Sequence, residues 1–408
     1  MGGRAVTSPR DTPRAVWLLP YYPWEGDPVS GTFFQNQVRA LAAASADVTV
    51  VAPTPWVPPL FSRLRSRWRR YAAAPASQVA DGVPVVRPRY PTLPRDSTIA
   101  APDRLIANAA WRVRRRWLPA DLIHGHFALQ ALAAAVLARR TGLPYVVTMH
   151  GSDVNSWPEA HPEWRVALVS ALEGAARVIA VSGALADRIA QLADVQAVVL
   201  PIGLDHAEFR RAAGSDRSRL REQAGIAQDA MVALFVGNLL RSKGIAEFVE
   251  GIDRAGPQVV GVVIGEGPER RHLESGGSAL SRLRWLGRLP NDAVAQWMAA
   301  ADALVLPSSA EGLPTVIVEA GSVGLPVIAS RVGGIPELLD DDRGIVLRDI
   351  SGRAVAEALA LVADPGVRSA MIDRLRRHVE LSYDSHLNAA RLIDVYRSAM
   401  IDGGASRT

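Results

Sequence analysis

The chain has 408 residues, and at roughly 150 residues per domain this length predicts two or three domains with full hydrophobic cores. With 49% hydrophobic and 21% charged residues, the composition excludes disordered and collagen-like proteins. The absence of cysteine excludes disulfide scaffolds, thiolate metal sites and cysteine nucleophiles. The formal net charge of +5 favours anionic partners, and Lys243 is the one lysine among the 46 basic residues.

Short apolar runs alternate with segments of helical period, a pattern typical of βαβ units and parallel sheets. In the first half we expect helices at 32–44, 129–140, 164–174 and 183–192, between strands at 15–19, 47–52, 122–124, 145–149, 178–181 and 198–200. In the second half we expect helices at 243–255, 268–274, 292–300, 315–323 and 352–362, between strands at 232–236, 259–264, 303–306 and 327–329.

A polar break near 201–209 separates the two series. The sequence therefore predicts an α/β fold of two doubly wound, Rossmann-like domains facing across a cleft, with residues 15–200 in the first domain and 201–384 in the second. Ligands of such sheets bind beyond the carboxyl ends of the strands. Because no apolar run approaches the ~18 residues of a spanning helix and no signal peptide is recognisable, we expect a cytoplasmic protein.

The strongest motif is the segment 308–319, SSAEGLPTVIVE, which follows a predicted strand and opens a predicted helix. The backbone amides of Thr315, Val316 and Ile317 form the first turn of this helix, which makes a phosphate site. Glu311 and Glu319 flank that turn, and carboxylates accept hydrogen bonds from hydroxyl pairs. This combination suits a nucleotide sugar, although a capped helix with two solvated glutamates has the same pattern.

A second motif, residues 235–244 (FVGNLLRSKG), also runs from a strand end into a helix. It places Arg241 and Lys243 where they can neutralise a diphosphate. The alternative is a pair of solvated cations on a helix surface.

In the first domain, Gly31 precedes the first helix and allows a phosphate to approach the backbone. His150 and Asp153 follow the strand 145–149, where a histidine can donate to a sugar hydroxyl, or can be a structural loop residue. His124 and His126 with His150 form a poor zinc-site candidate, because no carboxylate accompanies them. We therefore expect no metal.

Two arginine-rich stretches with tryptophans, residues 60–71 and 111–118, are typical of interfacial helices on anionic membranes. The candidate membrane-facing residues are Arg63, Arg67, Trp68, Arg70, Arg114 and Trp117. Ordinary domain helices with charged outer faces fit these stretches equally well. Neither stretch belongs to a recognised nucleic-acid-binding module, so we expect no nucleic acid partner.

Residues 307–338, including EGLP and GLPVIA, strongly resemble retaining glycosyltransferases of family four with the GT-B fold. The segments 236–244, 264–270, 286–307, 201–209, 148–153 and 30–41 resemble the same family, so the similarity extends over nearly the whole chain. The opening segments 28–33 and 37–41 are similar to bacterial cell-surface polysaccharide transferases, such as those of teichuronic acid synthesis.

The resemblance implies that Glu311 holds donor-sugar hydroxyls, Glu319 the ribose, and Lys243 with the amides of 315–317 the diphosphate. It also implies that Gly31 closes the phosphate site, that His150 lies against the sugar, and that Leu289 lies near the base. The last helix, residues 385–400, is implied to pack on the first domain. Asn238 stands where many members carry a phosphate-binding arginine, so either Arg241 replaces it or Lys243 and the helix termini suffice.

We therefore expect a metal-independent, retaining glycosyltransferase without a cofactor, using a UDP- or GDP-sugar as donor and associated peripherally with the inner membrane face. The acceptor is a glycan, a lipid-linked glycan or a small molecule of secondary metabolism. The alternatives are a nucleotide-sugar epimerase of the same architecture and a non-enzymatic basic scaffold that binds membranes or polymers.

Overall fold

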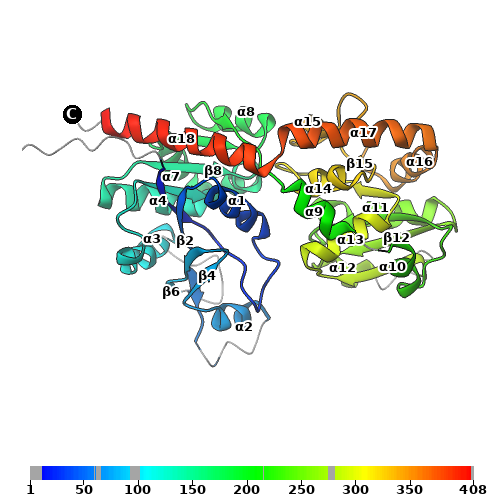
Figure 1. Cartoon of the computed structure of the whole chain (residues 1–408), viewed down its shortest axis with the longest axis horizontal. Helices are drawn as coiled ribbons and strands as arrows, with labels where there is room; N and C mark the ends of the chain where they lie inside the picture. Colours follow the sequence, from blue (N-terminus) through cyan, green and yellow to red (C-terminus); the bar gives the residue numbers. More distant parts are fainter. Residues whose placement is uncertain are drawn as a thin grey trace, which may run out of the picture. The chain divides into compact units, whose positions relative to one another are not determined.

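The computed structural model describes residues 12–58, 60, 66–91, 102–214, 216–273 and 281–405. It divides into two compact units (Figure 1). The N-terminal unit contains the described residues up to Gly203 and those from Ser385 onward, and the C-terminal unit spans Leu204–Asp384. Within the described residues, no helix is both long and apolar enough to span a membrane.

The N-terminal unit is built on a sheet with the strand order β10-β9-β8-β7-β1-β2-β5-β4. All neighbouring strands are parallel except β4 and β5, which pair antiparallel. The strands are β1 (Arg14–Leu18), β2 (Asp47–Val51), β4 (Ser77–Ala80), β5 (Val83–Val86), β7 (Leu122–His126), β8 (Tyr145–Met149), β9 (Arg177–Ala180) and β10 (Val198–Val199). A separate parallel pair consists of β3 (Thr54–Trp56) and β6 (Arg89–Pro91).

Capping residues in the sequence mark the ends of several helices of this unit. For example, Gly142 ends α4 in the left-handed conformation, and the Ser182 hydroxyl caps α8. The helices are α1 (Thr32–Ala43), α2 (Ser66–Ala73), α3 (Pro102–Arg112), η2 (Arg114–Arg116), α4 (Phe127–Thr141), α5 (Ser152–Asn155), α6 (Trp157–Ala160), α7 (Pro162–Glu173), α8 (Gly183–Leu192) and α18 (Ser385–Ala405).

The first and last helices of the unit share one core. Ala15 and Trp17 of β1, together with Leu19 directly after the strand, belong to the core face on which α1 and α18 pack. Tyr396 of α18 is fully buried there, and its hydroxyl accepts a hydrogen bond of 2.8 Å from Trp17 Nε1. The final helix is therefore an integral part of the N-terminal unit.

The C-terminal unit contains a parallel sheet with the order β13-β12-β11-β14-β15-β16. Its strands are β11 (Met231–Val236), β12 (Val259–Ile264), β13 (Leu283–Gly287), β14 (Ala303–Leu306), β15 (Val327–Ala329) and β16 (Ile345–Val346). Its helices are α9 (His206–Ala213), α10 (Arg217–Gln223), η3 (Arg241–Lys243), α11 (Ile245–Arg254), α12 (Glu269–Leu273), α13 (Asn291–Ala300), α14 (Thr315–Val323), α15 (Ile335–Leu339), α16 (Gly352–Val362) and α17 (Pro365–Ser382).

The sequence-based elements agree with the structure at most positions. The strands predicted at 145–149, 259–264, 303–306 and 327–329 and the helices at 183–192, 315–323 and 352–362 are confirmed residue for residue. The prediction at 243–255 was wrong at its start, because residues 241–243 form a 3₁₀ turn and α11 begins after Gly244. The half-exposed edge strands β13 and β16 and the strands β3, β4, β5 and β6 were not predicted, because their apolar patterns are short. The helix α2 overlaps the helix-like stretch 60–71.

Gly244 explains the path of the loop that joins β11 to α11. Its φ is +71°, and a Cβ atom at this position would overlap the backbone carbonyl of Pro307, at the end of β14. Only glycine therefore lets the loop after β11 approach the loop after β14 this closely.

We expect Gly244→Ala to lower the free energy of unfolding by about 3 kcal/mol or more, through left-handed strain plus the backbone overlap. Gly225→Ala is the matched control: its φ is +63°, but nothing lies within 4 Å of the added Cβ. The control should lose only about 1 kcal/mol. Equal shifts of the urea midpoints in the two variants would contradict the close approach.

Candidate functional site

The strand order of the C-terminal unit brings two loops together. Strand β11 pairs with β12 on one side and β14 on the other, so the direction of winding reverses between β11 and β14. Loops that leave the carboxyl ends of strands at such a switch point form the usual ligand site of these sheets. The loop after β11 carries Lys243, and the loop after β14 carries Glu311 and leads into α14.

Lys243 and Glu311 form an ion pair, with Nζ and Oε2 separated by 2.7 Å. The Glu311 side chain is 7% exposed and that of Lys243 is 27% exposed, so the carboxylate is the more enclosed partner. The amide of Ser309 donates to the carbonyl of Ser242 over 2.9 Å and ties the two loops beside the pair. The two sequence motifs therefore converge on a single cluster.

The first turn of α14 lies directly after this cluster. Pro314 occupies the N-cap position and provides no capping side chain. Among the described residues, the amides of Thr315 and Val316 have no acceptor, so they are available to an anion. The Ile317 amide differs, because it already donates to the carbonyl of Pro314 over 3.0 Å.

Glu319 lies one turn further along α14 and is half-buried. Its carboxyl has no hydrogen-bond or ion-pair partner among the described residues, and burial raises its pKa to about 7. Leu289 is half-buried just after β13, whereas the side chains of Arg241 and Asn238 are exposed. Arg241 stands two residues before Lys243 in the same 3₁₀ turn.

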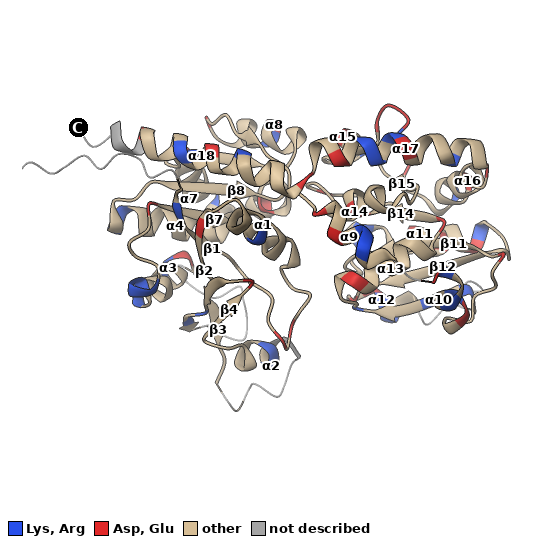
Figure 2. Ribbon diagram, viewed as in Figure 1, with Lys and Arg blue, Asp and Glu red and all other residues tan. Residues whose placement is uncertain are grey.

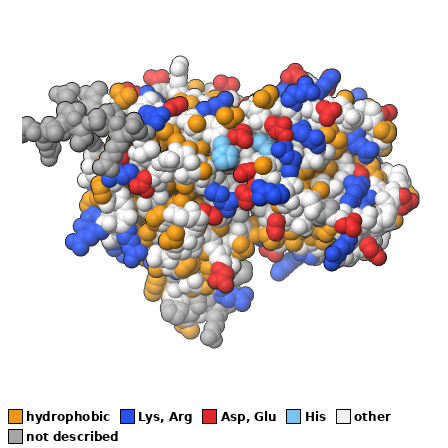
Figure 3. Space-filling model, viewed as in Figure 1, with side chains coloured by type: hydrophobic (Ala, Val, Ile, Leu, Met, Phe, Trp, Pro, Cys, Tyr) orange, Lys and Arg blue, Asp and Glu red, His pale blue; other side chains and the backbone are white. Residues whose placement is uncertain are grey.

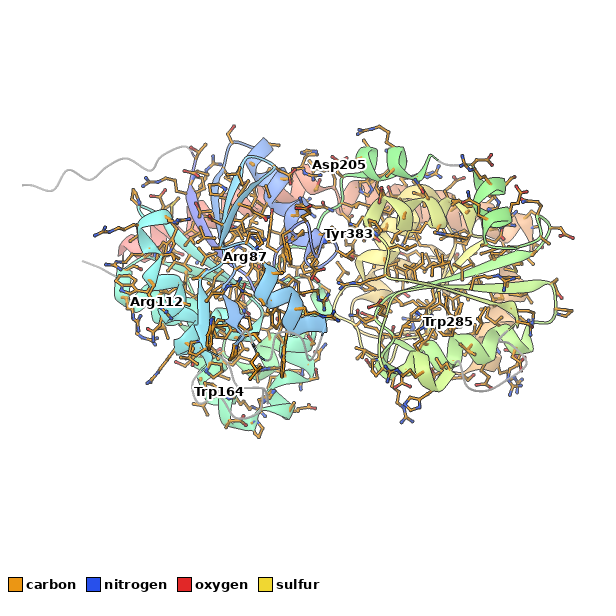
Figure 4. All side chains as sticks on the ribbon, turned by 90° about the horizontal axis from the view of Figure 1, so that it is seen from below. Arg87, Arg112, Trp164, Asp205, Trp285 and Tyr383 are labelled. Carbon is orange, nitrogen blue, oxygen red and sulfur yellow. The ribbon has the colours of Figure 1, made fainter. Side chains whose placement is uncertain are left out.

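In the N-terminal unit, Gly31 is the N-cap residue of α1, with a φ of +87°. The loop that leads to it is held by Arg87, which lies among the strands and loops of this unit (Figure 4). Arg87 Nη2 donates to the carbonyls of Tyr22 and Pro23 over 3.0 Å each. The approach to the helix terminus at Gly31 is therefore fixed by a buried guanidinium.

His150 follows β8 and is half-buried. Burial lowers its pKa to about 3, so the imidazole is neutral at physiological pH. Its Nε2 atom lies 3.1 Å from Nδ1 of His126, and its ring lies 4.3 Å from the ring of Phe127 between centroids.

Asp153 has a structural task in the same loop. Its carboxylate accepts hydrogen bonds from the backbone amides of His150 and Gly151, the shortest of 2.7 Å. Burial raises its pKa to about 6 against the lowering effect of these bonds. The sequence makes Asp153 a candidate acceptor or sugar contact, and in the structure its carboxylate caps its own turn.

The histidines of β7 are buried side by side. His124 and His126 are two residues apart in a strand and share one face, with ring centroids separated by 4.1 Å. His124 bonds to Tyr396 over 2.7 Å and to Thr148 over 2.8 Å. In the described part of the chain, no group of three or more histidines or carboxylates is arranged to hold a metal ion.

Sequence analysis did not single out His126 as the partner of His150. The usable signal was the alternation His-Gly-His in a buried strand, followed by a third histidine at the end of the next strand. Strand pairing of β7 with β8 then brings His126 opposite Thr148, two residues before His150.

The interfacial prediction was wrong for Trp68 and Trp117. Trp68 is 8% exposed, and Trp117 is 4% exposed with its indole N–H donating to the carbonyl of Ala110, so both belong to the interior. Arg70 pairs with Asp27 over 3.4 Å, and Arg114 stacks on the ring of Trp111. Arg63 lies outside the described residues, as does the side chain of Arg67.

Two known protein families match the chain, one in each unit. The family described as "Glycosyl transferases group 1" matches residues 230–364, and the "Glycosyl transferase 4-like domain" matches residues 30–203. The chain belongs to the group 1 glycosyltransferases. This membership favours sugar transfer over the epimerase and scaffold alternatives.

Two related proteins illustrate the range of the family. The chain is 33% identical over 390 residues to the "Putative teichuronic acid biosynthesis glycosyltransferase TuaC" of Bacillus subtilis, covering 94% of this chain and 98% of that protein. It is 34% identical over 244 residues to the 2-deoxystreptamine glucosyltransferase of Streptomyces kanamyceticus, covering 55% of this chain and 62% of that protein.

Solved structures show the same fold. Sucrose-phosphate synthase from Thermosynechococcus elongatus matches with a TM-score of 0.78 at 19% identity, over 95% of this chain and 99% of that one. HepE from Anabaena in complex with UDP and glucose matches with a TM-score of 0.72 at 21% identity, over 95% of this chain and 100% of that one. The predicted GT-B fold, with two Rossmann-like domains, is confirmed.

Glu319 predicts a pH dependence of stability. A carboxyl whose pKa is about 7 in the folded protein and 4.5 in the unfolded chain stays protonated to higher pH when folded. The wild-type protein should therefore lose stability as the pH rises from about 4.5 to 7, and Glu319→Gln should remove this loss.

We expect the melting temperature of Glu319→Gln to exceed that of the wild type at pH 8, and this advantage to shrink towards pH 5. Glu222→Gln, on the exposed surface of α10, is the control. A pH-independent difference between Glu319→Gln and wild type would show that the carboxyl titrates in the ordinary range.

Proposed function

We propose that the chain is a retaining, metal-independent glycosyltransferase that moves a sugar from a nucleoside diphosphate sugar to an acceptor hydroxyl. The observation that carries the proposal is the Lys243–Glu311 pair directly before the open N-terminal turn of α14. It combines a cation, available backbone amides and a carboxylate within one loop cluster. A nucleoside diphosphate sugar offers the matching groups: a dianion flanked by hydroxyls on both sides.

The diphosphate is assigned to Lys243 and the amides of Thr315 and Val316. When the sugar departs, negative charge grows on the β-phosphate, and prearranged N–H groups and an ammonium stabilise this charge. Supporting this assignment, Lys243 is fixed by its ion pair and the two amides have no acceptor among the described residues. The amide of Ile317 contributes less to phosphate binding, because it already donates to the carbonyl of Pro314.

The sugar and the nucleoside are assigned to the surrounding side chains. Glu311 Oε2 bonds to Lys243, which leaves Oε1 to accept from a sugar hydroxyl. The half-buried carboxyl of Glu319 suits the ribose hydroxyls, and Leu289 is assigned to the base. In the N-terminal unit, the family resemblance makes Gly31 a phosphate contact and His150 a sugar contact, and we retain both as proposals.

Retention of configuration requires the acceptor to attack from the face that the diphosphate leaves. In this route the bond between the acceptor oxygen and C1 forms as the bond between C1 and the phosphate oxygen breaks. The acceptor proton passes to the departing phosphate oxygen. The cation and amides act on that same phosphate, so no protein nucleophile is needed.

The proposed acceptor belongs to cell-surface glycan synthesis. This rests on the similarity to the teichuronic acid protein, which extends over 94% of this chain, whereas the match to the aminocyclitol glucosyltransferase covers 55% of it. UDP is the first nucleotide to test, because the structural relative HepE was solved with UDP and glucose. GDP is the second.

The donor is tested by thermal stabilisation with UDP, GDP, TDP, ADP and their common sugars, in buffer containing EDTA. A ligand at a hundred times its Kd should add ~2.7 kcal/mol of stability. We expect one base to stabilise the protein clearly and to do so without metal. If folded protein responds to none of these nucleotides, the donor assignment is wrong.

The cation is tested by comparing Lys243→Ala with Arg241→Ala. We expect Lys243→Ala to reduce turnover of the selected donor about 10²- to 10³-fold, because it removes charge stabilisation at the leaving group. Arg241→Ala should stay within about threefold of wild type, since that side chain is exposed. The reverse order would move the phosphate contact to Arg241.

A peripheral membrane contact is proposed at the end of α3 and in the η2 turn. Arg112, Arg115 and Arg116 are exposed there, next to Leu118, which is 37% exposed, and no carboxylate of the described residues pairs with them. Figure 2 shows this basic turn beside α3. Elsewhere, on the face shown in Figure 3, basic and acidic side chains are interspersed.

We expect the full-length protein to bind vesicles containing phosphatidylglycerol more tightly than neutral vesicles. Replacing Arg112, Arg115 and Arg116 by Gln should remove most of this difference, at about 1 kcal/mol per arginine. Binding should also fall as salt increases. Equal binding of the wild type and the triple variant would place the membrane contact elsewhere or exclude it.

A further inference from the structure

The ring of His150 packs against aromatic side chains of two helices. Phe33 and Phe34 of α1 lie edge-on at 5.7 Å each, and Phe127 of α4 lies at 4.3 Å. Phe127 has a φ of +67°, a strained value for a bulky residue. Phe127 is the first residue of α4, directly after β7, so the strain lies at the junction of strand and helix and accompanies the contact of its ring with His150.

One hydrogen bond fixes the orientation of the ring. Nε2 of His150 lies 3.1 Å from Nδ1 of His126, which is 1% exposed. Burial lowers the pKa of both imidazoles, so both rings are neutral. In a neutral pair one ring nitrogen donates and the other accepts, and the direction of the bond decides where each proton lies.

The remaining nitrogen of His126 decides that direction. Nε2 of His126 is buried and has no hydrogen-bond partner among the described residues. Orphaned buried N–H groups are rarer in proteins than under-used acceptors. The favoured state of His126 therefore has its proton on Nδ1 and an unprotonated Nε2, and it donates to Nε2 of His150.

The neighbouring histidine belongs to a separate chain of bonds. Trp17 Nε1 can only donate, so Tyr396 accepts from it and directs its own proton to Nδ1 of His124. His124 then donates from Nε2 to Thr148. This chain ends without reaching His150, although the ring centroids of His124 and His126 are only 4.1 Å apart.

We propose that His126 is a positioning residue that makes Nδ1 of His150 a neutral N–H donor for an oxygen of the bound donor sugar. Nδ1 of His150 has no partner among the described residues, and His150 is half-buried rather than sealed. The backbone of His150 is held independently by Asp153. The sugar contact rests on the proposed function, whereas the tautomer is a property of the free protein.

The tautomer is tested first, without ligand. Full-length protein labelled with ¹⁵N-histidine gives long-range ¹H–¹⁵N correlations that distinguish protonated from bare ring nitrogens. At pH 7 we expect the proton of His150 on Nδ1 and that of His126 also on Nδ1. Signals are assigned by their loss in His150→Gln and His126→Asn. A proton on Nε2 of His150 overturns the proposal.

The effect on catalysis is tested with UDP-glucose, or with the donor selected by the nucleotide panel, as release of nucleotide. His126→Phe keeps an aromatic ring and removes the donor, and we expect kcat to fall about tenfold with KM for the donor nearly unchanged. Asn places an N–H near the position of Nδ1, so His126→Asn should recover most of the turnover. Tyr396→Phe, which breaks only the separate chain, is the matched control and should remain within about threefold.

These experiments distinguish failure of the positioning role of His126 from failure of the proposed function. If His126→Phe and His126→Asn both turn over like wild type, or both fail equally while Tyr396→Phe is active, the positioning role is wrong even if a donor binds. If no nucleotide binds but the predicted tautomer is found, the proposed function fails and the hydrogen-bond assignment stands.

Discussion

The close approach of two loops in the C-terminal unit organises the candidate site around Lys243 and Glu311. Gly244 lies against the backbone of Pro307, and the amide of Ser309 bonds to the carbonyl of Ser242. These backbone contacts bring the chain's one lysine to a glutamate 68 residues away. The ion pair therefore rests on main-chain geometry that a side chain at position 244 would disrupt.

The N-terminal unit also carries loops at the point where the winding of its sheet reverses, but with different side chains. Winding reverses between β1 and β7, and the loops beyond these strands carry Gly31 and the strained Phe127. Here buried indole, imidazole and phenol groups meet, those of Trp17, His124, His126 and Tyr396. Such groups remain neutral when buried, and each bond in the chain determines the proton position of the next one.

Two carboxyl groups of the C-terminal unit differ in how their burial is compensated, and the uncompensated one lowers the stability of the free protein. Glu311 is enclosed but compensated by Lys243, whereas Glu319 is half-buried without a partner among the described residues and has a raised pKa. An uncompensated carboxyl is unfavourable in the free protein and becomes favourable when hydroxyl groups of a ligand bond to it. Unsatisfied groups of this kind are expected where a ligand completes the structure.

Local sequence patterns are enough to predict the alternation of strands and helices and the position of both motifs at strand ends. These features depend on local periodicity and on residues such as Gly142 and Ser182 that end or cap helices. The sequence also indicated the family, because the glutamate motif and its spacing are continuous in the chain.

Which of these groups come into contact depends on how the chain packs in three dimensions. The Lys243–Glu311 pair, the His126–His150 bond and the burial of Trp68 and Trp117 depend on strand order and packing between distant segments. The spacing of residues in the sequence does not predict these contacts. An arginine-rich helix, for example, has the same pattern whether its tryptophans face the core or a membrane. Burial and pairing are set by the whole fold, and they decide which residue can bind a ligand and which must support it.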